Sequence, residues 1–166
     1  MGEIVGGTLH TSPRPSPAHA VAASGVGSDL HQPFHRGRGG PGGWWILPKP
    51  ELHLEDDVLV PDLAGWRRAR LPKMPETAFF ELAPDWVCEV LSPSTSRLDR
   101  VSKLPRYAAA GVGHAWLVDP LAQTLEVYRR VGAAWLLVGT YGGDATVRPE
   151  PFEAVEVELS GWWDTG

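Results

Sequence analysis

Short runs of apolar residues, separated by turn-forming residues, fill the chain from residue 44 onwards. The runs WWILPKPELHL and VLVPDLAGW flank the acidic segment Glu55-Asp56-Asp57, and this arrangement predicts a β-hairpin. Further apolar or alternating runs predict strands at residues 85–91, 114–118, 124–130, 134–141 and 154–159. We therefore expect the second half of the chain to be rich in β-structure.

Two segments have the composition and spacing of helices. Residues 18–30 predict the first, and residues 97–110 predict the second, in which Pro105 kinks the helix or delays its start and Gly111 ends it. Near the N-terminus, EIVGGTL (3–9) predicts a short strand with a turn or bulge at its two glycines. Elements in this order predict an α/β or α+β fold, with a mixed central sheet flanked by helices, rather than a Rossmann repeat.

The segment between the first helix and the strand runs is irregular in composition. Residues 36–43 (RGRGGPGG) predict a loop, which we expect to be mobile. His31 and His35, just before this loop, have the i,i+4 spacing of a helical metal site, but Pro33 lies between them and disfavours a helix interior. We therefore interpret both histidines as loop residues.

The composition is that of an ordinary soluble globular protein. A length of 166 residues, with 43% hydrophobic and 21% charged residues, predicts a single domain over residues 1–166. The single Cys88 excludes an intramolecular disulfide framework. No run approaches the ~20 apolar residues of a membrane span, and the first residues lack the pattern of a secretory signal, so we expect a cytoplasmic protein without a membrane partner. The net charge of -5 argues against a broad nucleic-acid-binding surface.

Two acidic residues interrupt otherwise apolar strand runs. Asp62 follows VLVP, and Glu89 lies within DWVCEVL. An ionised carboxylate in such a position is costly unless it is paired or coordinates a metal. Two carboxylates on strands that can run side by side therefore indicate a divalent-cation site, and phosphodiester chemistry is the leading hypothesis.

The spacing of these acids is close to that of a known nuclease motif. A PD-(D/E)xK nuclease has an Asp at a strand end and, on the next strand, a Glu two residues before a Lys; the acids hold the metal and the Lys positions water or stabilises developing charge. Asp62 and Glu89 match the first two positions, but Leu91 stands where the lysine belongs. Lys103 on the following helix could reach the site instead. The alternative for Lys103 is an exposed i,i+4 ion pair with Asp99, worth about 0.3 kcal/mol.

Two longer segments resemble the Uma-type putative restriction endonuclease family, small bacterial proteins of the PD-(D/E)xK nuclease superfamily. They are PELHLEDDVLVPDLAGWRRARLP and EVLSPSTSRLDRVSKLPRYAAAGVGHAWLVDP, and the similarity extends from EIVGGTL to about Arg130. Family members usually carry a further stretch before the EIVGG-like strand. The resemblance implies a restriction-endonuclease-like fold that depends on Mg²⁺, for which Mn²⁺ can substitute. In that family the active-site lysine has moved to the helix, so the resemblance assigns this role to Lys103.

Other residues are candidates for supporting roles. Glu51, which the hairpin sets opposite residue 61, could supply a third carboxylate to the metal, or it could face solvent. His19 in the first helix is an accessory candidate, and the pair Trp162-Trp163 could cover a sheet edge or a dimer contact. Three arginines near the acids could contact phosphates or belong to solvated surfaces: Arg67, Arg68 and Arg100.

The sequence thus leads to one function and two rivals. The leading hypothesis is a metal-dependent DNA endonuclease with Asp62, Glu89 and Lys103 at its centre. The first rival is a nuclease-fold protein that binds nucleic acid but cuts it weakly or not at all. The second rival is a structural module that forms homodimers, in which the acids would pair with Arg100 or Arg106.

Overall fold

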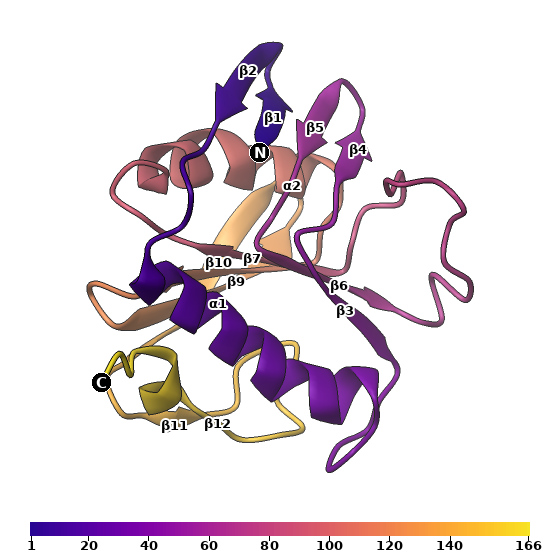
Figure 1. Ribbon diagram of the computed structural model, residues 1–166. Coiled ribbons are helices and arrows are strands. Elements are labelled where there is room, and N and C mark those ends of the chain that lie inside the picture. Colours follow the sequence, from indigo (N-terminus) through magenta and orange to yellow (C-terminus); the bar gives the residue numbers. More distant parts are fainter.

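Alternating apolar residues in six strands let the central sheet bury both of its faces. In the computed structural model, which describes residues 1–166, this sheet has the order β10-β9-β8-β7-β6-β3 (Figure 1). β7 and β8 pair in parallel, and all other neighbours are antiparallel. The strands are Trp44–Pro48 (β3), Leu63–Arg67 (β6), Trp86–Val90 (β7), His114–Asp119 (β8), Thr124–Val131 (β9) and Ala134–Gly142 (β10). The prediction of a mixed α+β fold around a mixed sheet is confirmed.

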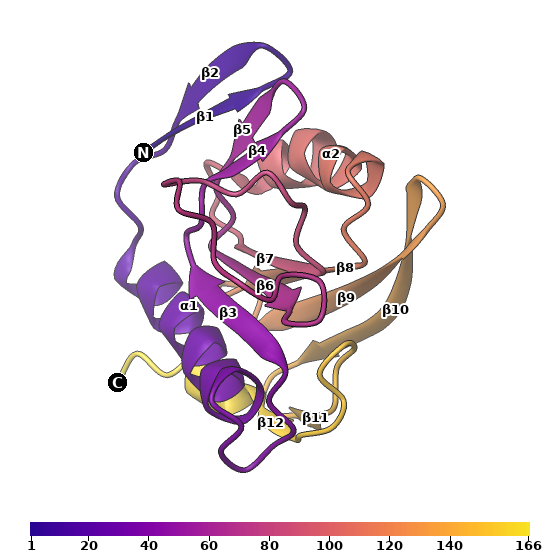
Figure 2. The ribbon, with the colours of Figure 1, turned by 90° about the vertical axis from the view of Figure 1, so that its right-hand side faces the viewer.

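Different elements cover the two faces of this sheet. Helix α1 and the C-terminal segment lie on one face, and helix α2 and a small second sheet lie on the other (Figure 2). In β7, Trp86, Cys88 and Val90 belong to the core under α1, whereas Val87 belongs to the core under α2. Because side chains alternate along a strand, Glu89 points to the α2 face together with Val87.

Helix α1 spans Pro17–Leu30 and has a capped N-terminus, close to the predicted residues 18–30. The Ser16 side chain accepts a hydrogen bond from the backbone N–H of His19 at 3.2 Å. Pro17 fits the first turn, where its missing N–H has no intrahelical partner to lose. Ala22, Val26 and Leu30 of α1 belong to the core under the face that this helix covers.

The chain continues beyond α1 as one π-helical turn, His31–His35 (η1). Our interpretation of His31 and His35 as loop residues is therefore wrong. The wider turn accommodates Pro33, whose ring would clash in an α-helical turn with the carbonyl group of the residue four positions earlier. The two imidazole rings stack with their centroids 4.1 Å apart, and His35 Nδ1 accepts a hydrogen bond from the backbone N–H of Ile46 in β3.

The second helical segment carries the chain from β7 to β8, since a parallel strand pair needs a crossover connection. It consists of a π-helical part, Leu98–Lys103 (η2), and helix α2, Leu104–Ala109. The predicted helix at residues 97–110 is confirmed. Pro105 lies in the first turn of α2, where it is tolerated. None of the helices in the protein has the length and apolar composition that crossing a membrane requires.

The small sheet has the order β2-β1-β5-β4. The predicted hairpin around Glu55-Asp56 is confirmed, but Pro48 and Pro61 interrupt it, so β3 pairs with β6 in the central sheet while β4 pairs with β5 in the small one. EIVGGTL forms a second hairpin whose turn uses positive φ angles at Gly6 and Gly7. The strands are Gly2–Val5 (β1), Thr8–Thr11 (β2), Leu52–Leu54 (β4) and Asp57–Leu59 (β5).

The C-terminal segment forms less strand than the sequence predicts. Within the predicted strand 154–159, only Val157–Glu158 (β12) is a strand, and it pairs with Thr146–Val147 (β11). A 3₁₀ turn, Leu159–Trp162 (η3), follows and packs against α1.

Trp162 is a core residue and not the edge or dimer cover that the sequence suggests. It is 1% exposed and lies against Gly25 of α1. Its indole N–H donates a hydrogen bond to Asp29 Oδ2 at 2.8 Å. The absence of a side chain at Gly25 thus lets the indole ring approach the helix closely.

The Gly-rich segment 36–43 is a loop, as predicted. Backbone hydrogen bonds join Arg38, Gly42 and Gly43 to residues outside this segment. The mobility of the loop stays a prediction.

Replacing Trp162 by Ala is expected to lower the free energy of unfolding by about 3–5 kcal/mol, the usual cost of deleting a buried aromatic side chain. The adjacent Trp163 is only half-buried, so Trp163→Ala should cost clearly less. Urea unfolding followed by circular dichroism measures both losses. Equal losses would contradict the placement of Trp162 in the core.

Candidate active site

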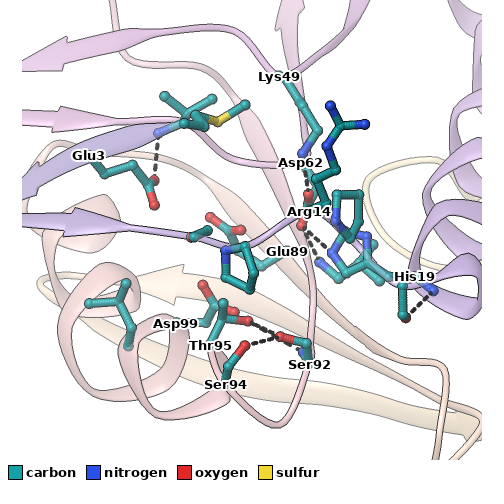
Figure 3. A pocket seen from close by; sticks show the side chains of 18 of the residues that line it. Glu3, Arg14, His19, Lys49, Asp62, Glu89, Ser92, Ser94, Thr95 and Asp99 are labelled. Carbon is teal, nitrogen blue, oxygen red and sulfur yellow. Dashed lines mark hydrogen bonds and ion pairs between the residues drawn. The ribbon is translucent and has the colours of Figure 1, made fainter.

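The three residues that the sequence predicts at the centre of the site come together. Asp62 stands directly before β6, and Glu89 lies in β7; the register sets Leu63 opposite Cys88, so the two acids lie at the same end of this strand pair. Lys103 reaches Glu89 from the end of η2. All three side chains line one cavity of about 500 Å³, part of which Figure 3 shows.

The ammonium group of Lys103 is buried among three carboxylates. Its Nζ lies 2.7 Å from Glu3 Oε1, 2.7 Å from Glu89 Oε1 and 3.8 Å from Asp99 Oδ1. The i,i+4 pair with Asp99 is thus present, but it is buried and not the exposed pair considered from the sequence. Burial lowers the pKa of Lys103, yet the three acids outweigh burial and the net pKa is raised. Lys103 therefore carries its charge at neutral pH.

The acids around Lys103 outnumber it, so they do not all ionise readily. Burial raises the pKa of Glu89 well above its ordinary value, although Lys103 acts in the opposite direction. Burial also raises the pKa of Asp99 to about 6, again against the attraction of Lys103. The Tyr107 hydroxyl donates a hydrogen bond of 2.7 Å to Glu89 Oε1 and fixes that carboxyl group. A further cation in this cavity would be stabilised by the excess of acids.

Asp62 is held by contacts to both of its oxygens. Oδ1 lies 2.9 Å from Lys49 Nζ, and Oδ2 accepts a 2.8 Å hydrogen bond from the backbone N–H of Val90. Burial raises the pKa of Asp62, but His19, Lys49 and the Val90 N–H together outweigh it, and the net pKa is lowered. Asp62 is therefore ionised at neutral pH.

His19, the accessory candidate, lies beside Asp62. It is buried and lines the cavity, with Nε2 3.5 Å from Asp62 Oδ2 (Figure 3). Its other ring nitrogen, Nδ1, is buried without a hydrogen-bond partner in the protein. Its proximity agrees with the sequence-based expectation, and its role stays a prediction.

Glu51 lies outside the cavity. The hairpin pairs Leu54 with Asp57, which sets residue 51 opposite residue 60, so the expected register was wrong by one residue. The exposed Glu51 carboxylate lies 2.7 Å from His53 Nε2. Glu51 is thus a solvent-facing glutamate, which was the second possibility considered from the sequence. It is not placed to share a metal with Asp62.

The three arginines proposed for phosphate contacts do not line the cavity either. Arg67 and Arg68 stack on Trp44 and Trp45, at 4.5 Å and 3.8 Å from the ring centroids. Arg100 pairs with Glu126 of β9 at 3.1 Å. These side chains are engaged in structural contacts, which the sequence could not reveal because it does not give the partner of each charge.

Three site residues were missed in the sequence: Glu3, Lys49 and Tyr107. Glu3 lies in a strand next to apolar residues, and its Oε1 also accepts a 2.7 Å hydrogen bond from the backbone N–H of Val60. The rule that identified Glu89, an acid within an apolar strand run, would have found Glu3. Lys49 and Tyr107 carry no comparable signal, since lysine in a loop and tyrosine in a helix are common.

The residues of the cavity fit a magnesium ion held by few protein ligands. Mg²⁺ is usually bound by one or two carboxylates together with water and substrate phosphates. Asp62 and Glu89 provide two carboxylates, and both contacts of Glu89 use Oε1, so that Oε2 has no protein partner. No three His, Cys, Asp or Glu side chains of the protein converge closely enough to hold an ion between them. The site therefore provides two protein carboxylates for a metal ion and no third protein ligand.

Comparison with known proteins identifies the family of this chain. A family model described as putative restriction endonuclease, Uma2, matches residues 2–160. The chain belongs to this family. A search of curated proteins gives no significant match.

A solved structure shares the fold of this Uma2-family chain. It is a putative nuclease belonging to DUF820 from Anabaena variabilis, with a TM-score of 0.80 and 24% sequence identity. The match covers 98% of this chain and 89% of that one. At this level of identity the similarity establishes the fold, and the chemistry must be argued from the residues of the cavity.

Asp99→Asn is expected to stabilise the protein above pH 6. The pKa of Asp99 is raised from 3.8 to about 6 in the folded state, so its contribution to stability is complete below about pH 4 and is lost as the pH rises through about 6. The side-chain amide of the Asp99→Asn variant does not ionise, so the variant keeps this contribution to stability as the pH rises. The gain in unfolding free energy should therefore reach about 1–3 kcal/mol at pH 8 and shrink below pH 4.

Urea unfolding of wild type and Asp99→Asn at pH 4 and pH 8 measures this difference. Asp56→Asn is a matched control, because Asp56 is exposed and has no ion pair. A gain of the same size at both pH values would contradict the assignment to Asp99.

Proposed function

We propose that this Uma2-family protein is a Mg²⁺-dependent DNA endonuclease that hydrolyses phosphodiester bonds, with Mn²⁺ able to replace Mg²⁺. The observation that carries the proposal is the 2.7 Å contact between Lys103 of the helix and Glu89 of the strand, next to Asp62 in one cavity. This contact brings an ammonium group to Glu89, in the cavity that Asp62 also lines, although Leu91 occupies the strand position of the motif. The family match and the nuclease-like fold support the same conclusion.

In this proposal Asp62 and Glu89 hold the metal ion. A bound Mg²⁺ polarises the scissile phosphate and lowers the pKa of a bound water. Asp62 is suited to this role because its pKa is lowered, so the side chain is in the ionised form that a metal ligand requires. The Val90 N–H and the Tyr107 hydroxyl fix the orientations of the two carboxyl groups.

Lys103 acts as a charged hydrogen-bond donor. Its raised pKa means that it has no free lone pair at neutral pH, so it does not serve as a general base. An ammonium group at this position can orient the attacking water and stabilise the negative charge that develops on the phosphate. Glu3 and Asp99 keep the ammonium group charged and hold it in place.

A second candidate function is a nuclease-fold protein that binds nucleic acid but cuts it weakly or not at all. One observation favours it: Lys49 already neutralises Asp62 at 2.9 Å. The net charge of -5 points the same way. The dimerisation module has less support, since the acids pair with lysines, while Arg100 and Arg106 pair with Glu126 and Asp57.

Purified protein is expected to nick or cut plasmid DNA when Mg²⁺ or Mn²⁺ is added. Asp62→Ala should abolish cleavage because it removes the ionised metal ligand. Lys103→Met should lower the cleavage rate by about 10²–10³-fold, the usual cost of losing one donor to developing charge. Gel electrophoresis of the DNA products measures these rates, and circular dichroism confirms that each variant is folded.

Glu76→Gln serves as the control, because the Glu76 side chain is 92% exposed and lies outside the cavity. Its cleavage rate should equal that of wild type. Calorimetry with MnCl₂ separates the candidates further. Salt-sensitive DNA binding without metal-dependent cleavage would favour the non-cutting candidate, and a wild type that binds no divalent cation would refute the enzyme proposal.

A further inference from the structure

Lys49 is a charged residue of the cavity that the proposed chemistry does not use. Its Nζ lies 2.9 Å from Oδ1 of Asp62, the proposed metal ligand, and Asp62 is its only ion-pair partner. The Lys49 side chain is 43% exposed, whereas that of Lys103 is 2% exposed. Lys49 can therefore leave its acid without disturbing the core, and Lys103 cannot.

The backbone at Lys49 adopts an unusual conformation. Its φ angle is +46°, in the left-handed region that favours glycine, and it lies between Pro48 and Pro50. Such a conformation costs on the order of 1 kcal/mol and persists only where the surroundings fix it. Here the backbone N–H of Lys49 donates a 3.0 Å hydrogen bond to the Asp62 carbonyl, which holds the loop over Asp62. This hydrogen bond thus keeps the backbone of Lys49 close to the residue whose carboxylate its ammonium group contacts.

A metal ion and Lys49 compete for the same carboxylate. Lys49 neutralises Oδ1 of Asp62, and Oδ2 is engaged by the Val90 N–H with His19 3.5 Å away. A divalent cation that approaches Asp62 meets the charge of Lys49 at close range and is repelled. Binding of the metal therefore becomes more favourable when Lys49 moves away from Asp62.

Lys49 needs another anion if it is to leave Asp62 at low cost. Glu3, Glu89 and Asp99, the other acids of the cavity, already surround Lys103. A phosphate group entering the cavity from solvent is the remaining partner, since a lysine ammonium binds phosphate as a compact charge. Arg14 lines the same cavity and has no ion-pair partner in the protein, so a second cation is available to the same phosphate (Figure 3).

We propose that Lys49 exchanges Asp62 for a phosphate of the DNA backbone, so that substrate binding frees Asp62 for the metal ion. The inference rests on the proposed function, because it assumes a metal at Asp62. It adds a residue that contacts substrate and makes metal affinity depend on substrate. Coupling of this kind is reciprocal, so the metal must strengthen DNA binding by the same factor.

Calorimetric titration with MnCl₂ tests the exchange, with and without a phosphorothioate DNA duplex that resists cleavage, after subtraction of Mn²⁺ binding by the duplex alone. In wild type the duplex should tighten Mn²⁺ binding by roughly 5–150-fold, the usual range of coupling between sites. Lys49→Met should bind Mn²⁺ about tenfold more tightly than wild type without DNA. The duplex should then add little further affinity for the metal.

Two further variants make the result specific. Lys49→Gly also removes the ammonium group, and glycine accepts the positive φ angle, so this variant should fold and behave as Lys49→Met does. Lys73→Met is the matched control, because Lys73 is 85% exposed and lies outside the cavity. It should retain the wild-type coupling.

The outcomes separate this inference from the proposed function. Equal Mn²⁺ affinity of wild type and both Lys49 variants would overturn the exchange and leave the metal-dependent nuclease standing. Tighter Mn²⁺ binding with unchanged coupling to DNA would also overturn it, since Lys49 would then not bind phosphate. Absence of Mn²⁺ binding in every protein would overturn both proposals.

Discussion

The burial of one ammonium group among three carboxylates is the interaction on which the site depends. Glu3 comes from β1 in the small sheet, Glu89 from β7 in the central sheet, and Asp99 from the same helical segment as Lys103. The contacts therefore connect three separate elements at one point. A buried charge is tolerated only when it is paired, so the charge of Lys103 depends above all on Glu3 and Glu89, the two acids at 2.7 Å.

The two carboxylates proposed as metal ligands have opposite pKa shifts. The cavity is lined by more carboxylates than lysines, so burial of their negative charge is not fully compensated. Asp62 is held as a carboxylate by cations and an N–H group, whereas burial works against the charge of Glu89. A divalent ion would favour the ionised form of both, because it supplies positive charge where the protein has too little.

Much of the fold and the centre of the site follow from sequence patterns. Apolar runs, proline breaks and glycine turns located most strands and both helices, and acids inside apolar runs identified Asp62 and Glu89. Patterns of this kind indicate burial but not the partner of a side chain. They therefore leave Arg68 open to a phosphate contact or a solvated surface, whereas its guanidinium stacks on Trp45. The burial of Trp162 depends on its contacts with α1, which is distant in sequence.

The route of the chain around the cavity gives the two lysines different mechanical properties. Lys103 belongs to the crossover between β7 and β8, so the hydrogen bonds of two adjacent core strands anchor its segment at both ends. Lys49 belongs to the link between β3 and β4, which are strands of two different sheets. Lys103 is thus held by the central sheet, and Lys49 lies in the segment that connects the two sheets. The contact between Lys103 and Glu89 thus lies within the central sheet and its crossover, whereas the position of Lys49 depends on how the two sheets are joined.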